Sequence, residues 1–91
     1  MELRWSLPAA KDPERIFQRI QADNPDAARR VAQKIFDGCE SLSEFPNRGR
    51  ISRVRGKREI SFPGLPYIAL YRLRRDAVEN SRIYHAAQDW P

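Results

Sequence analysis

The hydrophobic pattern of the chain changes period near residue 45, from a helical repeat to an alternating one. Before that point, apolar residues recur every three or four positions in two blocks, which predict helices over roughly 9–22 and 25–43. The second block carries the longer apolar stripe, formed by Ala28, Val31, Ala32, Ile35, Phe36, Cys39 and Leu42. The link QADN between the blocks is short, so we expect the two helices to lie antiparallel as a hairpin.

Capping residues support both helix starts. Ser6 or Asp12 is a candidate N-cap for the first helix, and Asn24 is the candidate for the second. Pro8 and Pro13 are expected in the first turn of the first helix, where a missing backbone N–H breaks no hydrogen bond.

Alternating apolar and polar residues predict four strands. They are MELRW at 1–5, REISF at 58–62, YIALYRL at 67–73 and VENSRIY at 78–84. The turn sequences PGLP and RRDA separate the last three, which are therefore expected to be antiparallel neighbours. The predicted order is β-α-α-β-β-β in a single domain, 1–91. This is an α+β fold in which a helical hairpin packs on one face of a small, mainly antiparallel sheet and the other face stays open to a partner.

Charge separates the two halves of the chain, whose formal net charge is +5. Residues 1–47 contain 7 Lys and Arg against 8 Asp and Glu, whereas residues 48–91 contain 10 against 4. The basic excess of the second half predicts an acidic partner, either nucleic acid or an acidic protein segment. A solvated basic face without a partner is the alternative.

Several classes of site are excluded by the residue types present. One histidine and one cysteine cannot supply the three or four ligands of a zinc site, and no metal or cofactor is expected. Cys39 lies on the apolar stripe and is expected to be a buried structural residue. The sequence has no apolar run long enough to span a membrane and no secretory signal at its N-terminus, which predicts a cytoplasmic protein.

The densest cationic stretch is RGRISRVRGKR, residues 48–58. It carries six cations and no acid: Arg48, Arg50, Arg53, Arg55, Lys57 and Arg58. Such a stretch binds phosphates, binds the carboxylates of an acidic protein, or is a solvated linker. Composition alone does not distinguish these three interpretations.

Polar residues of the last three strands form a second candidate set. Its members are Glu59, Arg72, Arg82, Tyr84 and His85, with Tyr67 and Tyr71 beside them. Antiparallel pairing brings alternate residues of neighbouring strands together. A carboxylate or histidine base, an arginine at the developing charge and a tyrosine or histidine acid suffice for phosphodiester cleavage. Arginines and tyrosines on an exposed sheet face are also ordinary structural residues.

Several of these segments resemble RelE/ParE-superfamily toxins of bacterial type II toxin–antitoxin modules, and most closely the ParE branch. The resemblance rests on Arg58-Glu59 opening a strand, Pro66-Tyr67 opening the next, and the closing run from His85 to Trp90. The opening LRW, the helix DNPDAARRVAQKI and the exit LSEFPNRGR are similar too, so the resemblance covers nearly the whole chain.

The resemblance implies a toxin that inhibits DNA gyrase by binding it, makes no bond of its own and forms a hetero-oligomer with a cognate antitoxin. Its partner-binding residues would be Arg50, Arg53, Arg55, Arg58, Tyr67, Arg72, Arg82 and Trp90. A ribosome-dependent mRNA endoribonuclease of the RelE type is the alternative, with Glu59, Arg82, Tyr84 and His85 as its catalytic set. A third possibility is an inactive homologue that only binds antitoxin.

Two features near the C-terminus carry further expectations. Trp90 and Tyr84 are expected to pack against the sheet or the helical hairpin, with His85 holding the turn by a hydrogen bond. Asn80 and Ser81 stand where the resemblance leads us to expect apolar residues. If either is buried, its unpaired polar group would cost about 1–3 kcal/mol.

Overall fold

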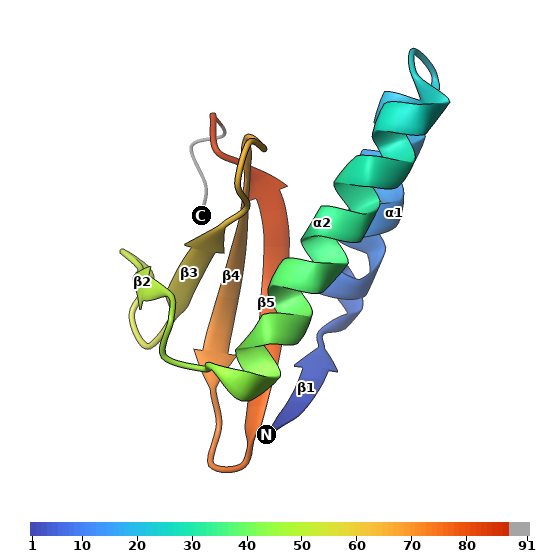
Figure 1. Cartoon of the computed structure of the whole chain (residues 1–91). Helices are drawn as coiled ribbons and strands as arrows, with labels where there is room; N and C mark the ends of the chain where they lie inside the picture. The colour runs from blue at the N-terminus through green and yellow to red at the C-terminus, as the bar shows by residue number, and fades with distance from the viewer. Residues whose placement is uncertain (88–91) are drawn as a thin grey trace.

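Side-chain caps set the start of both helices. In the computed structural model, which describes residues 1–87, helix α1 spans Leu7–Gln21 and helix α2 spans Pro25–Glu44 (Figure 1). The Ser6 hydroxyl accepts a hydrogen bond from the Ala9 N–H at 3.1 Å, and Asn24 accepts one from the Ala27 N–H at 3.0 Å. Of the two candidate caps for the first helix, Ser6 is therefore the cap, and the predicted cap of the second is confirmed.

The early start of α1 changes the place of its second proline. Pro8 lies in the first turn, as predicted, but Pro13 lies inside the helix, so that part of the prediction is wrong. The reason is that the Ser6 cap starts the helix two residues before the expected position. Pro13 is buried and leaves the carbonyl four residues before it without its usual helical partner.

Five strands form one sheet beside the helical hairpin. They are β1 (Glu2–Trp5), β2 (Arg50–Ile51), β3 (Arg58–Ser61), β4 (Tyr67–Leu73) and β5 (Ala77–His85). Their order in the sheet is β1-β5-β4-β3-β2, with β1 parallel to β5 and every other pair antiparallel. The α+β fold and the mainly antiparallel sheet are confirmed. Strand β2 was not predicted because its two residues lie inside the arginine-rich stretch.

The core lies between α2 and the sheet face that the hairpin covers (Figure 1). Its fully or almost fully buried members include Ile35, Cys39, Leu42, Ile60, Phe62, Ala69, Tyr71, Val78 and Ile83. The predicted burial of Cys39 is confirmed, and burial raises the pKa of its thiol to about 12.

One member of the predicted stripe does not belong to this core. Phe36 remains 46% exposed and packs against Trp5 of β1, with ring centroids 5.7 Å apart. Successive helical residues point about 100° apart, so Phe36 cannot share the direction of Ile35, which faces the sheet. The stripe prediction is correct for Ile35 and wrong for Phe36.

We expect the two neighbours to differ in their contribution to stability. Replacing Ile35, which is fully buried, by alanine should lower the free energy of unfolding by about 2–5 kcal/mol. Phe36→Ala should cost clearly less, because the side chain is already half in water. Chemical denaturation of both variants measures the difference. An equal or larger loss for Phe36→Ala would contradict this assignment of the core.

Candidate functional site

The strand registers place a set of polar residues on the sheet face opposite the helices. Ile60, Ala69 and Ile83 are aligned across β3, β4 and β5 and all belong to the core. Because side chains alternate between faces, the neighbouring row points away from the helices. That row holds Glu59 and the backbone position of Arg82, although the Arg82 guanidinium itself turns at the sheet edge toward α1. Tyr84 follows on the same face of β5.

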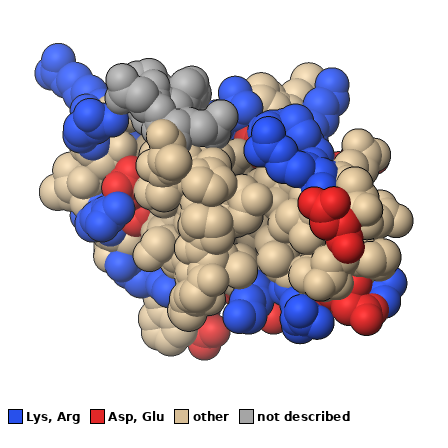
Figure 2. Space-filling view, turned by 90° about the horizontal axis from the view of Figure 1, so that it is seen from above, with Lys and Arg blue, Asp and Glu red and all other residues tan. Residues whose placement is uncertain are grey.

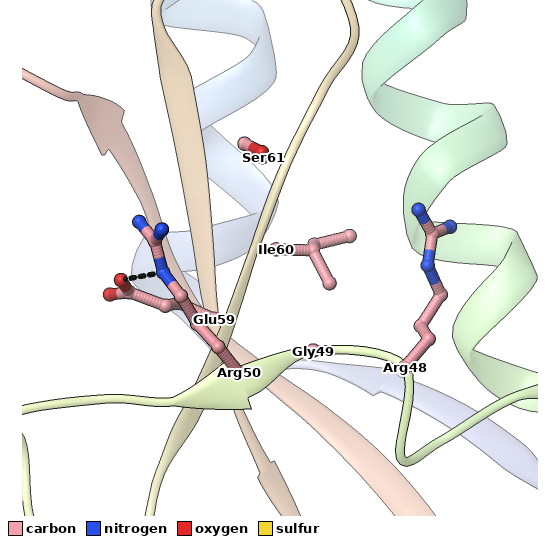
Figure 3. Close-up of a pocket in the computed structure, with 6 residues that line it drawn as sticks. All are labelled: Arg48, Gly49, Arg50, Glu59, Ile60 and Ser61. Carbon is pink, nitrogen blue, oxygen red and sulfur yellow. Dashed lines mark hydrogen bonds and ion pairs between the residues drawn. The ribbon is translucent and has the colours of Figure 1, made fainter.

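Glu59 is the centre of this outer face. The Arg50 Nε donates a hydrogen bond to Glu59 Oε1 at 2.7 Å (Figure 3). The Tyr84 hydroxyl donates a long one, 3.5 Å, to Oε2. Burial and the nearby Glu59 carboxylate raise the pKa of Tyr84, which keeps its hydroxyl protonated at neutral pH. The arrangement is an arginine, a carboxylate and a neutral phenol drawn from three different strands.

A cleft opens beside this cluster at the edge of the sheet. It has a volume of about 210 Å³ and is lined by Arg48, Gly49, Arg50, Glu59, Ile60 and Ser61 (Figure 3). Strand β2 covers only the first half of β3, since its two residues pair with Arg58 and Glu59. Among residues 1–87, no strand pairs with the β3 edge at Ile60 and Ser61, so this edge can accept a partner.

Tyr71 holds the segment that forms the cleft wall. Its buried hydroxyl donates to the Pro46 carbonyl at 2.8 Å and accepts from the Gly49 N–H at 3.0 Å. Arg58 donates to the Gly49 carbonyl at 2.8 Å. A Cβ on Gly49 would lie 2.5 Å from the Tyr71 hydroxyl oxygen, so only glycine fits here. These contacts fix the direction in which Arg48 and Arg50 leave the sheet edge.

The Arg82 side chain is hydrogen-bonded to a buried carboxylate, and this contact was not predicted from the sequence. Asp12 of α1, only 2% exposed, accepts from Arg82 at 2.9 and 3.2 Å and from the Ile83 N–H at 2.7 Å. It also pairs with Arg15. Burial would raise the pKa of Asp12, but hydrogen bonds from these three partners outweigh it and the pKa is lowered. The sequence held one indication of this contact, because Asp12 is a single carboxylate on the apolar side of the first helix.

The lone histidine lies on the other side of the sheet from Tyr84. His85 pairs in register with Tyr67, and their rings meet edge to face with centroids 5.5 Å apart. The His85 Nδ1 accepts a hydrogen bond from the Ala87 N–H at 3.0 Å. The ribonuclease set is thus divided, because Glu59 contacts Tyr84 but His85 is on the opposite face.

The other predicted partner-binding residues are spread over the sheet. Arg53 and Arg55 are exposed on the turn between β2 and β3, Arg72 is half-buried on β4, and Tyr67 is buried on the helix side. Trp90 lies outside the described residues, so its predicted packing is untested. Within residues 1–87 no group of histidine, cysteine or acidic residues is arranged to hold a metal ion.

Fold and site together define a small toxin-like α+β domain with a basic sheet edge, and comparison with known proteins agrees. Residues 3–90 match the ParE toxin family of type II toxin–antitoxin systems (parDE), and the chain belongs to this family, within the RelE/ParE superfamily. The predicted membership is confirmed.

Curated relatives and a solved structure support the assignment. The putative toxin Y4kP of Sinorhizobium fredii is 40% identical over 89 residues, covering 98% of this chain and 92% of the relative. Toxin RelE2 of Caulobacter vibrioides is 32% identical, covering 92% and 93%. A structure described as the chromosomal ParDE TA system from P. aeruginosa superposes with a TM-score of 0.87 at 27% identity, covering 93% of this chain and 95% of its own.

The Asp12 contacts generate a pH-dependent prediction. A carboxyl whose pKa is lower in the folded than in the unfolded chain contributes stability above the unfolded pKa, and this contribution is lost as pH falls through the folded value. Asp12→Asn should therefore lower the free energy of unfolding by about 1–3 kcal/mol at pH 7. Its difference from the unsubstituted chain should shrink as the pH is lowered below the ordinary Asp value of 3.8.

Denaturation at a series of pH values measures this difference. Asp37→Asn is the matched control, since Asp37 is exposed on α2. It should show a small difference at every pH. An Asp12→Asn difference that stays constant between pH 7 and pH 3 would contradict the proposed role of the carboxylate.

Proposed function

We propose that this toxin arrests bacterial growth by binding DNA gyrase as a protein inhibitor, without bond chemistry of its own. The observation that carries the proposal is the division of the polar residues between the two sheet faces. Glu59 is occupied by Arg50 and Tyr84, Arg82 is held by Asp12, and His85 is on the other face. The four residues of the ribonuclease set are therefore not gathered in one place, which supports a binding surface over that catalytic set.

The proposal includes an antitoxin as the neutralising partner and the bacterial cytoplasm as the place of action. The solved structure similar to this chain is described as a ParDE TA system. The basic second half and the open β3 edge suit an acidic segment that pairs with the edge and contacts the arginines around it. No helix within residues 1–87 is long and apolar enough to cross a membrane.

A second candidate is a ribosome-dependent mRNA endoribonuclease. Two of the relatives are named Toxin RelE1 and Toxin RelE2, and the Glu59–Tyr84 contact places a carboxylate beside a protonated phenol. In this function Glu59 would act as the base, Tyr84 as the acid, and the adjacent arginines would stabilise the charge that develops on the phosphate.

Two parallel assays separate the candidates. Purified toxin is expected to block gyrase supercoiling and to leave ribosome-bound mRNA intact, and His85→Gln is expected to keep nearly normal inhibition. If the toxin is a ribonuclease instead, ribosome-bound mRNA is cut. Glu59→Gln should then lower the turnover of mRNA by about 10²–10⁴-fold while binding to the ribosome is retained. Cleavage without gyrase inhibition would overturn the proposal. Activity in neither assay would leave a homologue that only binds antitoxin.

The antitoxin complex yields a prediction about rates. Replacing Arg53 and Arg55 by glutamine should slow association with the antitoxin about tenfold at low salt, and the difference should disappear at high salt, because these exposed charges act through long-range attraction. The control is Arg29→Gln with Arg30→Gln, an exposed pair on α2 that removes the same charge. Stopped-flow measurements at several salt concentrations test this. If the control pair slowed association as much as the Arg53, Arg55 pair, electrostatic steering by the turn between β2 and β3 would be contradicted.

A further inference from the structure

Two turns that are distant in the sequence lie at the same end of the sheet. The turn of residues 52–57 joins β2 to β3, and the turn of residues 74–76 joins β4 to β5. β3 and β5 start at this end and β4 finishes there; in Figure 1 the turn 74–76 lies at the bottom of the sheet and the turn 52–57 beside β2 at its left edge. Across the sheet they are offset by two strand spacings, so they lie at least about 10 Å apart.

Cations gather on these turns and on the strand residues next to them. They are Arg53, Arg55, Lys57, Arg72, Arg74 and Arg75. Acidic residues in the same part of the sheet are Glu2, Asp76 and Glu79; Glu79 forms a 3.6 Å ion pair with Arg74, and Glu2 pairs with Arg4. The opposite end of the molecule, seen from above in Figure 2, also carries Lys and Arg, in several groups around an uncharged centre. The cations of the two turns and the adjoining strand residues form a basic group at this end of the sheet.

These cations lie close enough to influence one another. Burial first, and then the positive charge of Arg72, lower the pKa of Lys57, while Glu79 raises it and Arg74 lowers it further. Like charges gathered on neighbouring strands repel. An anion bound across both turns would relieve this repulsion, and a polyanion would do so at several points at once.

The turns offer charge but no free backbone for strand pairing. The Ser52 N–H donates to the Lys57 carbonyl at 3.0 Å, and the Arg74 N–H donates to the Ala77 carbonyl at 2.8 Å. An apolar groove that includes Ile51 and Leu73 is present nearby. Ile51 is aligned with Arg58 and, through it, with core residue Tyr71, so the groove lies on the helix side of the sheet.

The cationic turns and the apolar groove lie in different places, and they suit two different kinds of partner. A protein segment needs apolar anchors and backbone pairing, which are available at the groove and at the open β3 edge. Nucleic acid is bound without sequence preference through side-chain contacts to phosphates, which is what the turns offer. Cations on turns at least about 10 Å apart can reach phosphates on both sides of the major groove of duplex DNA, which is about 12 Å wide.

We propose that this end of the sheet, formed by the turns 52–57 and 74–76, binds the phosphate backbone of duplex DNA. The choice of DNA rests on the proposed function, because gyrase acts on duplex DNA and a toxin bound to gyrase lies beside that substrate. The surface adds a second contact to the inhibited complex, with the DNA itself.

Binding to DNA alone tests the surface without gyrase, so this inference and the proposed function fail separately. Fluorescence anisotropy with a labelled 20-base-pair duplex of arbitrary sequence is measured from 50 to 200 mM salt. With about four phosphate contacts, log K should fall with log salt at a slope of about −3.6. The Arg74→Gln, Arg75→Gln pair should weaken binding about tenfold at 50 mM salt and reduce the slope by about 1.8.

The Arg53→Gln, Arg55→Gln pair should behave in the same way, and thermal melts confirm that each variant is folded. The Arg29→Gln, Arg30→Gln control on α2 removes the same charge and should change affinity less than twofold. Equal loss in the control would overturn the inference, since net charge alone would then explain binding. Tighter binding to a duplex RNA, or to a polyglutamate peptide of equal charge, would also overturn it in favour of that partner.

Discussion

The Asp12 carboxylate joins the helical hairpin to the strand that carries the outer-face residues. It accepts from the Ile83 backbone and from the Arg82 guanidinium, which are consecutive residues of β5, while its own backbone belongs to α1. A buried carboxylate left without these partners would be costly, so α1 and β5 can approach only in this register. Since β5 lies between β1 and β4, the position of the whole sheet relative to the helices depends on this contact.

A second polar anchor fixes the opposite edge of the sheet. The Tyr71 hydroxyl ties Pro46 and Gly49 to β4, so the chain leaving α2 reaches β3 at a defined place and Arg50 meets Glu59. Both anchors are side chains from the interior that bind backbone groups where regular pairing ends. The β3 edge that β2 leaves open lies beside the Tyr71 anchor.

The parts of this structure that depend on local periodicity could be predicted from the sequence. The two helices, the three C-terminal strands and the burial of Ile35 and Cys39 follow from repeats of 3.6 and 2 and from caps at Ser6 and Asn24. Features that depend on contacts between distant segments could not be predicted. Strand β2 has two residues and follows a glycine held by Tyr71 and Arg58, and the partner of Asp12 is 70 residues away.

An irregularity in β5 decides which polar residue joins Glu59. The pairing with β4 shifts between Leu70 and Tyr71, with Ser81 as the extra residue of β5. The shift reverses the alternation, so Val78 and Ile83, five positions apart, both face the core. Uninterrupted alternation would turn His85 toward Glu59 and Tyr84 toward the helices.

The N-cap of α1 stabilises this bulge, since Ser6 donates through its N–H to the Asn80 carbonyl and through its hydroxyl to the Ser81 carbonyl, both at 2.9 Å. The same geometry buries Asn80, whose amide atoms have no hydrogen-bond partner within the described residues, at a cost of about 1–3 kcal/mol. The expected penalty of a polar residue at this position is therefore present. It accompanies the bulge that places a neutral phenol beside the Glu59 carboxylate on the face available to a partner.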